Sequence, residues 1–157
     1  MEMEITDNRR DVKVADIKSI KPMLEKRRLK VLVIDDSSDS VILMSHILDH
    51  YNCDITVAYD GQDAVPLLMN REFDLVVLDW RMPDMGGKET LELIDRLLVD
   101  RKVRKLRSQI PVVIYSAHKE SEVDRPFVQK FEFVGFVDKR QGYSKMMKSL
   151  SEILRFI

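Results

Sequence analysis

The chain has 157 residues, of which 45% are hydrophobic and 34% charged, and its formal net charge is −1. This length fits one ordinary globular domain with a modest extension, and the composition is that of a folded core under a well-solvated surface. The balanced charge gives no general footprint for nucleic acid or for an anionic membrane, so we expect neither as a partner.

The cysteine content, the apolar runs and the N-terminal segment bear on where in the cell the protein is expected to lie. Cys53 is the single cysteine, so no intrachain disulfide can form. No apolar run is long enough to cross a bilayer. The N-terminal segment MEMEITDNRR lacks the apolar stretch of a signal peptide. We therefore expect a cytoplasmic protein.

Residues 1–28 differ from the rest of the chain. They carry dense charge and no strand-like run, and Pro22 interrupts the only helical stripe, which consists of Val14, Ile17, Ile20 and Leu24. We expect an N-terminal extension over residues 1–28, either flexible or forming a short docked helix, followed by one domain over residues 29–157.

From Lys30 onward, short apolar runs alternate with helical patterns. The predicted strands are Lys30–Ile34, Cys53–Ala58, Phe73–Leu78, Pro111–Tyr115 and Phe133–Val137. Apolar strands joined by helices predict a parallel sheet that is buried on both faces. In such α/β sheets, functional residues gather beyond the carboxyl ends of the strands.

The helices are predicted from caps and apolar spacing. Ser37 or Ser38 caps the first, the turn Asp60-Gly61 precedes the second, and the third extends from Lys88 as far as Arg107. A last helix extends from Tyr143 to the C-terminus. Pro126 falls where a further helix should precede the fifth strand, so we expect that helix to start late or to be short.

Polar residues follow four of these strands. Asp35 and Asp36 follow the first strand, Asp79 the third, Ser116 the fourth and Lys139 the fifth. Each of these features alone is most often a turn, a helix cap, a loop residue or a solvated lysine. Together they bring carboxylates, a hydroxyl and an ammonium group to one edge of the sheet.

This combination suits phosphoryl transfer. Crowded carboxylates repel one another unless a cation lies among them, and Mg²⁺ prefers carboxylate, water and phosphoryl oxygens. A carboxylate can also accept a phosphoryl group and become an aspartyl phosphate. Asp35 and Asp36 would hold the metal, Asp79 would accept the phosphoryl group, and Ser116 and Lys139 would hold its oxygens.

Four segments carry a resemblance to a known family: VLVIDDS, VVLDWRMPDMGG, VVIYSAH and GFVDKR. In this order and spacing they resemble the receiver domains of two-component signalling, over about residues 30–157. DWRMP resembles the single-domain chemotaxis type most. The resemblance implies a doubly wound α/β fold of the flavodoxin-like kind, with five parallel strands in the order 2-1-3-4-5 and helices on both faces.

The resemblance also assigns roles to residues. It implies that Asp35, Asp36, Asp79 and the backbone carbonyl of Arg81 bind Mg²⁺, that Asp79 is the phosphoacceptor, and that Ser116 and Lys139 are the switch hydroxyl and the phosphate-binding lysine. It makes Phe136 the aromatic residue whose rotamer reports phosphorylation, although a plain core aromatic is the alternative. Arg81 and His118 would flank the phosphoryl group and influence its lifetime, or be exposed loop residues.

One departure from the family lies beside the lysine. Arg140 stands where the family usually has a proline, often after a cis peptide bond. A cis bond before a non-proline residue costs about 2.5–4 kcal/mol, so we expect a trans bond here. The side chain of Lys139 should then point in a slightly different direction from that of the family's lysine.

The function predicted from these features is a phosphorylation-dependent signalling switch. A histidine kinase or phosphotransfer protein would supply the phosphoryl group, and the protein would change its partner binding as a monomer or a phosphorylation-dependent dimer. It would catalyse only its own phosphorylation and dephosphorylation. Two alternatives are the receiver portion of a longer regulator and a receiver-shaped interaction module that is not phosphorylated. A phosphohydrolase is disfavoured because Arg81 occupies the position of the acid such enzymes need.

Overall fold

The computed structural model describes residues 27–100 and 109–157. Its sheet has five parallel strands in the order β2-β1-β3-β4-β5, which confirms the predicted fold class. The strands are β1 (Lys30–Ile34), β2 (Asp54–Ala58), β3 (Leu75–Leu78), β4 (Ile110–Ser116) and β5 (Phe131–Asp138). The sequence placed every strand correctly, with ends that differ by no more than two residues.

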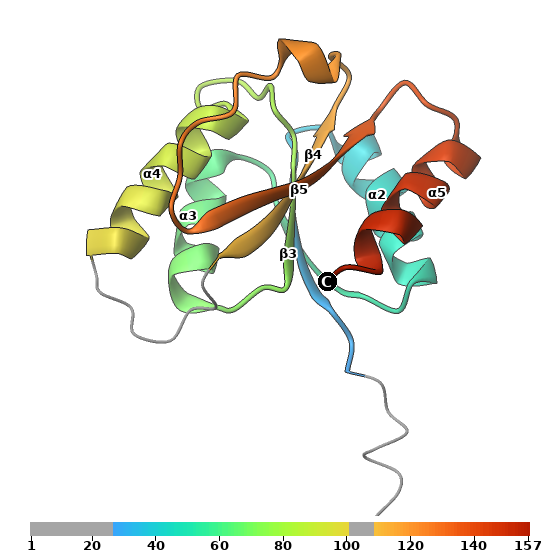
Figure 1. Ribbon diagram of the computed structural model, residues 1–157, viewed down its shortest axis with the longest axis horizontal. Coiled ribbons are helices and arrows are strands. Elements are labelled where there is room, and N and C mark those ends of the chain that lie inside the picture. Colours follow the sequence, from blue (N-terminus) through green and yellow to red (C-terminus); the bar gives the residue numbers. More distant parts are fainter. Residues whose placement is uncertain (1–26, 101–108) are drawn as a thin grey trace, which may run out of the picture.

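Two helices cover each face of the sheet (Figure 1). On one side are α2 (Ser38–His50) and α5 (Tyr143–Leu154), and on the other are α3 (Gly61–Asn70) and α4 (Gly87–Asp100). Alternate residues of the strands therefore enter two separate cores, as a period of two requires. Val31 and Val33 of β1 pack beside α2 and α5, whereas Leu32 of the same strand packs in the cluster beside α3 and α4.

Side-chain caps start the first two helices directly after their strands. Ser37 caps α2, because its hydroxyl accepts the backbone N–H of Ser40 at 3.3 Å. Asp60 caps α3 by accepting the N–H of Asp63 at 2.6 Å. Ser37 was one of the two caps predicted for the first helix, and Asp60 belongs to the turn predicted before the second. They turn the chain sharply at the carboxyl edge of the sheet, where the predicted functional residues lie.

The connection between β4 and β5, residues 117–130, corrects one prediction. It contains a 3-10 turn at Glu120–Glu122 and no α-helix, so the predicted late or short helix is wrong. Pro126 lacks the N–H that a helix needs. The buried carboxylate of Asp95 on α4 also accepts the N–H groups of Gln129 and Lys130, at 2.8 and 2.6 Å. These two donors are thereby held in an extended segment.

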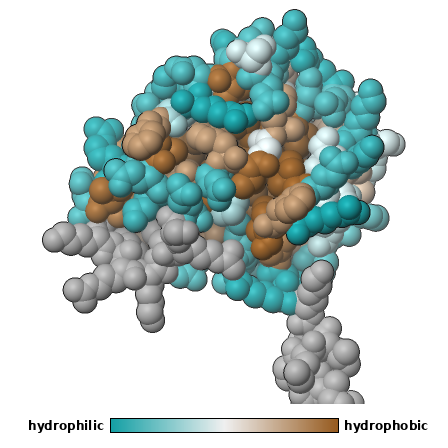
Figure 2. Space-filling view, in the orientation of Figure 1, coloured by the Kyte–Doolittle hydropathy of each residue, from teal (hydrophilic) through white to brown (hydrophobic). Residues whose placement is uncertain are grey.

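Without a helix in this connection, one flank of β5 is poorly covered. Phe133 and Phe136 on β5 are half-buried, and Phe127 in the connection is 95% exposed. Figure 2 shows hydrophobic residues in the middle of this face, where Figure 1 places β5. Apolar side chains of β5 and of the β4–β5 connection are thus partly open to solvent on this side of the sheet.

Some predictions fall outside the described residues. The expected N-terminal extension lies there except for Arg27 and Arg28, and so does the stretch of the third helix from residue 101 to Arg107. The described part of the third helix ends at Asp100. None of the helices in the described ranges is both long and apolar enough to span a membrane.

Candidate functional site

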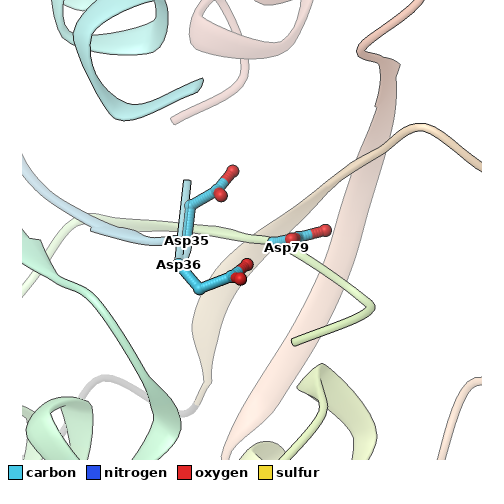
Figure 3. A group of neighbouring side chains, drawn as sticks. All are labelled: Asp35, Asp36 and Asp79. Atoms are coloured by element: carbon cyan, nitrogen blue, oxygen red, sulfur yellow. The ribbon is translucent and has the colours of Figure 1, made fainter. Parts of the chain in front are cut away.

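Three carboxylates meet at the carboxyl ends of two neighbouring strands (Figure 3). Asp35 and Asp36 follow β1 and Asp79 follows β3, and these strands pair in parallel with Ile34 opposite Leu78. One carboxylate oxygen from each aspartate lies within 4.8 Å of the others. Asp35 and Asp79 are buried, whereas Asp36 is exposed and leaves the cluster open to solvent.

Burial destabilises the negative charges of this cluster, so a nearby positive charge is favourable. Burial raises the pKa of Asp79, and the lysine charge of Lys139 opposes that rise while the charge of Asp35 adds to it. Asp35 Oδ1 accepts the N–H of Ser37 at 2.9 Å. Its other oxygen, Oδ2, is buried and accepts no hydrogen bond of ordinary geometry from the described residues. A buried carboxylate oxygen without such a donor is unfavourable, so a cation suits this position.

Lys139 supplies one such cation. Its Nζ lies 2.6 Å from Asp35 Oδ2 and 3.1 Å from Asp79 Oδ2. Its backbone N–H donates to the carbonyl of Ser116 at 2.9 Å, which ties the loop after β5 to the end of β4. Lys139 therefore contacts Asp35 and Asp79, at the edge of the sheet where the sequence predicted these residues to gather.

Arg140 shapes the loop where the family usually has a proline. Its backbone N–H, Nε and one terminal nitrogen all donate to the carboxylate of Asp138, at 2.8, 2.9 and 2.6 Å. These hydrogen bonds lower the pKa of Asp138 to about 2. No cis peptide bond occurs in the described ranges, so the Lys139–Arg140 bond is trans, as expected.

Ser116 and Phe136 occupy the next two strands. Ser116 ends β4, is completely buried, and its hydroxyl accepts the N–H of His118 at 3.1 Å. Phe136 lies opposite Ile114 in the β4–β5 ladder and packs against the core beside α3 and α4. The sequence placed Phe136 on the correct strand and Ser116 directly after its strand, which in the structure includes Ser116. The switching roles of both residues stay predictions.

Arg81 and His118 lie on the loops that flank the acidic cluster. The N–H of Arg81 points to Asp79 Oδ1 at 3.4 Å, while its side chain is exposed. The ring Nδ1 of His118 lies 3.4 Å from a carboxylate oxygen of Glu122. Both residues are thus close in sequence and space to the site, with side chains that face solvent at least in part.

Sequence reasoning missed two residues of this region. Tyr115 is buried on β4, with its ring centroid 4.9 Å from Lys139 Nζ. It precedes Ser116, and adjacent strand residues point to opposite faces, so the pattern marks Tyr115 only as core. Asp95 lies in an amphipathic helix, where an acidic residue is ordinary, and only the fold brings it to the β4–β5 connection. The one available signal is that Asp95 falls among apolar positions of α4.

Gly87 allows the loop after Asp79 to stay compact. A Cβ atom at this position would lie 2.8 Å from the carbonyl oxygen of Asp79. The N–H of Gly87 donates to the carbonyl of Trp80 at 3.0 Å. The chain therefore returns directly from Asp79 to the start of α4, which restricts the backbone around the candidate phosphoacceptor.

Comparisons of the sequence with known proteins agree with this geometry. The family model described as the response regulator receiver domain matches residues 31–151. The sensor protein GacS of Pseudomonas syringae pv. syringae is 29% identical over 110 residues, which are 70% of this chain. The chain spans only 12% of the length of that sensor protein.

Solved structures of similar proteins show the same fold. The N-terminal domain of a response regulator/sensory box/GGDEF 3-domain protein from Carboxydothermus hydrogenoformans is 25% identical, with a TM-score of 0.61 over 81% of this chain and 94% of that one. The CheX-CheY-BeF3-Mg complex from Borrelia burgdorferi gives 25% identity and a TM-score of 0.60 over 80% and 89%. The chemotaxis protein CheY4 of Vibrio cholerae, at 22% identity and a TM-score of 0.59 over 81% and 99%, supports the fold alone.

Proposed function

The chain belongs to the response regulator receiver domain family, and from this premise we propose that Asp79 accepts the phosphoryl group of a phosphorylation-dependent signalling switch. One observation carries the proposal: Asp35 and Asp79 are buried side by side, with Lys139 within 3.1 Å of both. Two buried carboxylates with one shared ammonium group are costly as a structural device alone. They suit a site that receives a metal ion and a phosphoryl group.

The phosphoryl donor that fits this chemistry is a phosphohistidine of a histidine kinase or of a phosphotransfer protein. A carboxylate oxygen of Asp79 forms the new P–O bond while the P–N bond of the donor breaks and its imidazole leaves with the electron pair. The side chain of Lys139 faces the charge on the transferred group. Members of this family generally act as signalling switches, and we propose that the chain catalyses only its own phosphorylation and dephosphorylation. In the second step water attacks the phosphorus atom, the P–O bond to Asp79 breaks, and inorganic phosphate and the free carboxylate are released.

We propose Mg²⁺ as the cofactor. Asp35, Asp36, Asp79 and the backbone carbonyl of Arg81 would hold it, because all are oxygen ligands of the kind that this ion prefers. Three carboxylates that lie within 4.8 Å of one another share one ammonium group, Lys139, so the cluster keeps an excess of negative charge that a divalent cation would offset. When bound, Mg²⁺ neutralises the carboxylates and the phosphoryl oxygens.

Neighbouring residues would then hold or expose the phosphoryl group. Lys139 and the hydroxyl of Ser116 donate to its oxygens. Arg81 and His118 lie on the loops beside it, and we propose that their side chains influence how readily water reaches the phosphorus atom. Since His118 already lies near Glu122, its position depends on the conformation of the β4–β5 connection.

We propose that the signal passes from Ser116 into this connection. Phosphorylation adds about −1.5 to −2 charges at Asp79 and attracts the hydroxyl of Ser116. That hydroxyl now accepts the N–H of His118, so its movement breaks a hydrogen bond at the start of the connection. Space then opens beside Phe136, whose ring turns inward. The output is a changed surface on the β4–β5 connection and β5, which alters binding to a partner.

The same switch suits a receiver within a longer regulator. GacS, in which the similar region is a small part, is described as a sensor protein. We propose the receiver function for this domain alone. The cytoplasmic location and the monomer or phosphorylation-dependent dimer likewise stay predictions.

Phosphoryl uptake tests the proposal. With Mg²⁺ and acetyl phosphate, the protein should gain one acid-stable, base-labile phosphoryl group, detected by intact mass. Asp79→Asn should take up none. Asp84→Asn, which changes an exposed carboxylate of the same loop, should be labelled normally, and Ser116→Ala should keep some uptake but lose the switch. Full labelling of Asp79→Asn would overturn the assignment.

Metal binding gives a second, independent readout. Because a ligand that binds only the folded state stabilises it, millimolar Mg²⁺ should raise the melting temperature. Asp36→Ala should remove most of this rise. A melting temperature that is unaffected by Mg²⁺ would contradict the shared metal site, whatever the labelling result.

A further inference from the structure

The ammonium group of Lys139 reaches the acidic site from the far edge of the sheet. Lys139 follows β5, whereas Asp79 follows β3 and Asp35 follows β1. Because the strand order is β1-β3-β4-β5, the lysine side chain must pass over the end of β4. The aromatic ring that it passes belongs to Tyr115, whose centroid lies 4.9 Å from Nζ.

The sheet register explains why these two side chains meet. Tyr115 lies opposite Val137 in the β4–β5 ladder, and both belong to the core beside α2 and α5. Lys139 comes two residues after Val137, directly beyond the end of β5, and its Nζ lies over the ring of Tyr115. A diagonal neighbour of this kind lies within reach of long and aromatic side chains. Tyr115 is only 1% exposed, so its ring is fixed by packing.

The backbone around Lys139 leaves the direction of its side chain to other contacts. Arg140 stands in place of the family's usual proline. Its guanidinium group pairs with Asp138, so that contact does not orient the side chain of Lys139. The hydrogen bond from the Lys139 N–H to Ser116 fixes the backbone of the loop. It places no restriction on the four-carbon side chain, which carries considerable rotamer entropy when free.

We propose that Tyr115 is a positioning residue, whose ring face holds the ammonium group of Lys139 over the acidic site before the phosphoryl group arrives. This inference rests on the proposed function of Asp79. An ammonium group within about 6 Å of a ring centroid is attracted to the negative ring face, most strongly when water is excluded. The Lys139 side chain is only 14% exposed, so the contact is largely shielded.

The phenol supports this role because it stays neutral. Burial, followed by the charges of Asp35 and Asp79, raises the pKa of Tyr115 to about 12, against a smaller opposing effect of Ser40. Tyr115 therefore adds no negative charge that would compete with the carboxylates for Lys139. The ring face presents the same electrostatic surface across the working pH range.

Beryllofluoride, which stands in for the phosphoryl group, provides the test. Its affinity in saturating Mg²⁺ can be followed by the fluorescence of Trp80, the single tryptophan, which directly follows Asp79. Tyr115→Leu removes the ring and should weaken binding about three- to thirtyfold. Tyr115→Phe keeps the ring and should bind within about twofold of the wild type. Unchanged affinity in Tyr115→Leu would overturn the inference.

A double-mutant cycle separates positioning from packing. In a Lys139→Met background, whose weaker binding requires higher beryllofluoride concentrations, Tyr115→Leu should have no further effect. An equal loss in both backgrounds would show that Tyr115 acts through the core and would overturn the inference. If the wild type itself bound no beryllofluoride, the proposed function would fail first, which distinguishes the two failures.

A measurement on the wild type needs no stable variant of Tyr115. The Nζ atom of Lys139 lies over the Tyr115 ring, so the ring current should move the NMR signals of the adjoining ε-methylene protons upfield of ordinary lysine values. The other lysines of the chain serve as internal references. Ordinary signals for Lys139 would contradict the ring contact.

Discussion

The two halves of the site differ in how they are built. At the ends of β1 and β3, three carboxylates lie together on a compact backbone, and every predicted acidic residue is in its expected position. At the ends of β4 and β5, a proline is replaced by Arg140 and the expected helix is replaced by an extended connection. The acidic half therefore matches the arrangement expected from the resemblance, whereas the half at β4 and β5, called the rebuilt half below, departs from it in both its loop and its connection.

In the rebuilt half, polar contacts hold the β4–β5 connection against the domain, where a helix would have packed through an apolar face. Asp95 holds the end of the β4–β5 connection through two backbone N–H groups, and Lys88 forms an ion pair with Asp124 in its middle. Val123 and Val128 add apolar contacts with the core. An extended segment held at a few points can move with less disruption than a packed helix.

Among the polar contacts of the β4–β5 connection, the largest effect is expected from the anchor at Asp95. Asp95→Ala leaves two backbone donors without their charged acceptor and should reduce the free energy of unfolding by about 2–3 kcal/mol. Urea denaturation measures this loss. Glu92→Ala, an exposed change on the same helix, should shift it by less than about 0.5 kcal/mol. Equal effects of the two substitutions would contradict an anchoring role.

A smaller effect is expected from pH in the acidic half. Burial raises the pKa of Asp79, so the folded protein binds this proton more tightly than the unfolded chain does. The resulting stability is fully present below the unfolded value of about 3.9 and is lost as pH rises through the folded pKa. Without metal, the wild type should therefore lose stability relative to Asp79→Asn as pH rises from about 4.

Thermal unfolding of both proteins across this pH range, with EDTA present, tests the sign. The stability difference should grow with pH and then become constant, and Mg²⁺ should reduce it by neutralising the carboxylates. A wild type that gains stability relative to Asp79→Asn as pH rises would contradict the conclusion that burial of the Asp79 charge outweighs its attraction to Lys139.

The smallest expected effect lies at Phe127 on the β4–β5 connection. Because this side chain is 95% exposed, Phe127→Ala should change the free energy of unfolding by less than about 0.5 kcal/mol. Phe131→Ala, four residues later at a buried position, should cost about 3–5 kcal/mol. Urea denaturation of the pair would show whether the connection packs as described. A large loss at Phe127 would show a contact absent from this structure.

The sequence predicted the acidic half better than the rebuilt half for a physical reason. Strands and capped helices are determined by local spacing, so Asp35, Asp79 and Lys139 could be assigned to strand ends from the chain alone. The β4–β5 connection depends on Asp95, which contacts it across more than thirty residues. No local pattern contains that contact. Tyr115 was missed because a buried aromatic residue in a strand is usually core, and only the strand order shows that Lys139 must pass over it.

The central claim is that phosphorylation of Asp79 is transmitted through the β4–β5 connection. Amide hydrogen exchange of the Mg²⁺-bound protein, with and without beryllofluoride, tests it most directly, and Asp79→Asn serves as the control. We predict altered exchange over residues 117–130 and at Phe136, besides the loop after Asp79, and no change in the control. Changes confined to the loop after Asp79, with residues 117–143 unaffected, would contradict the account.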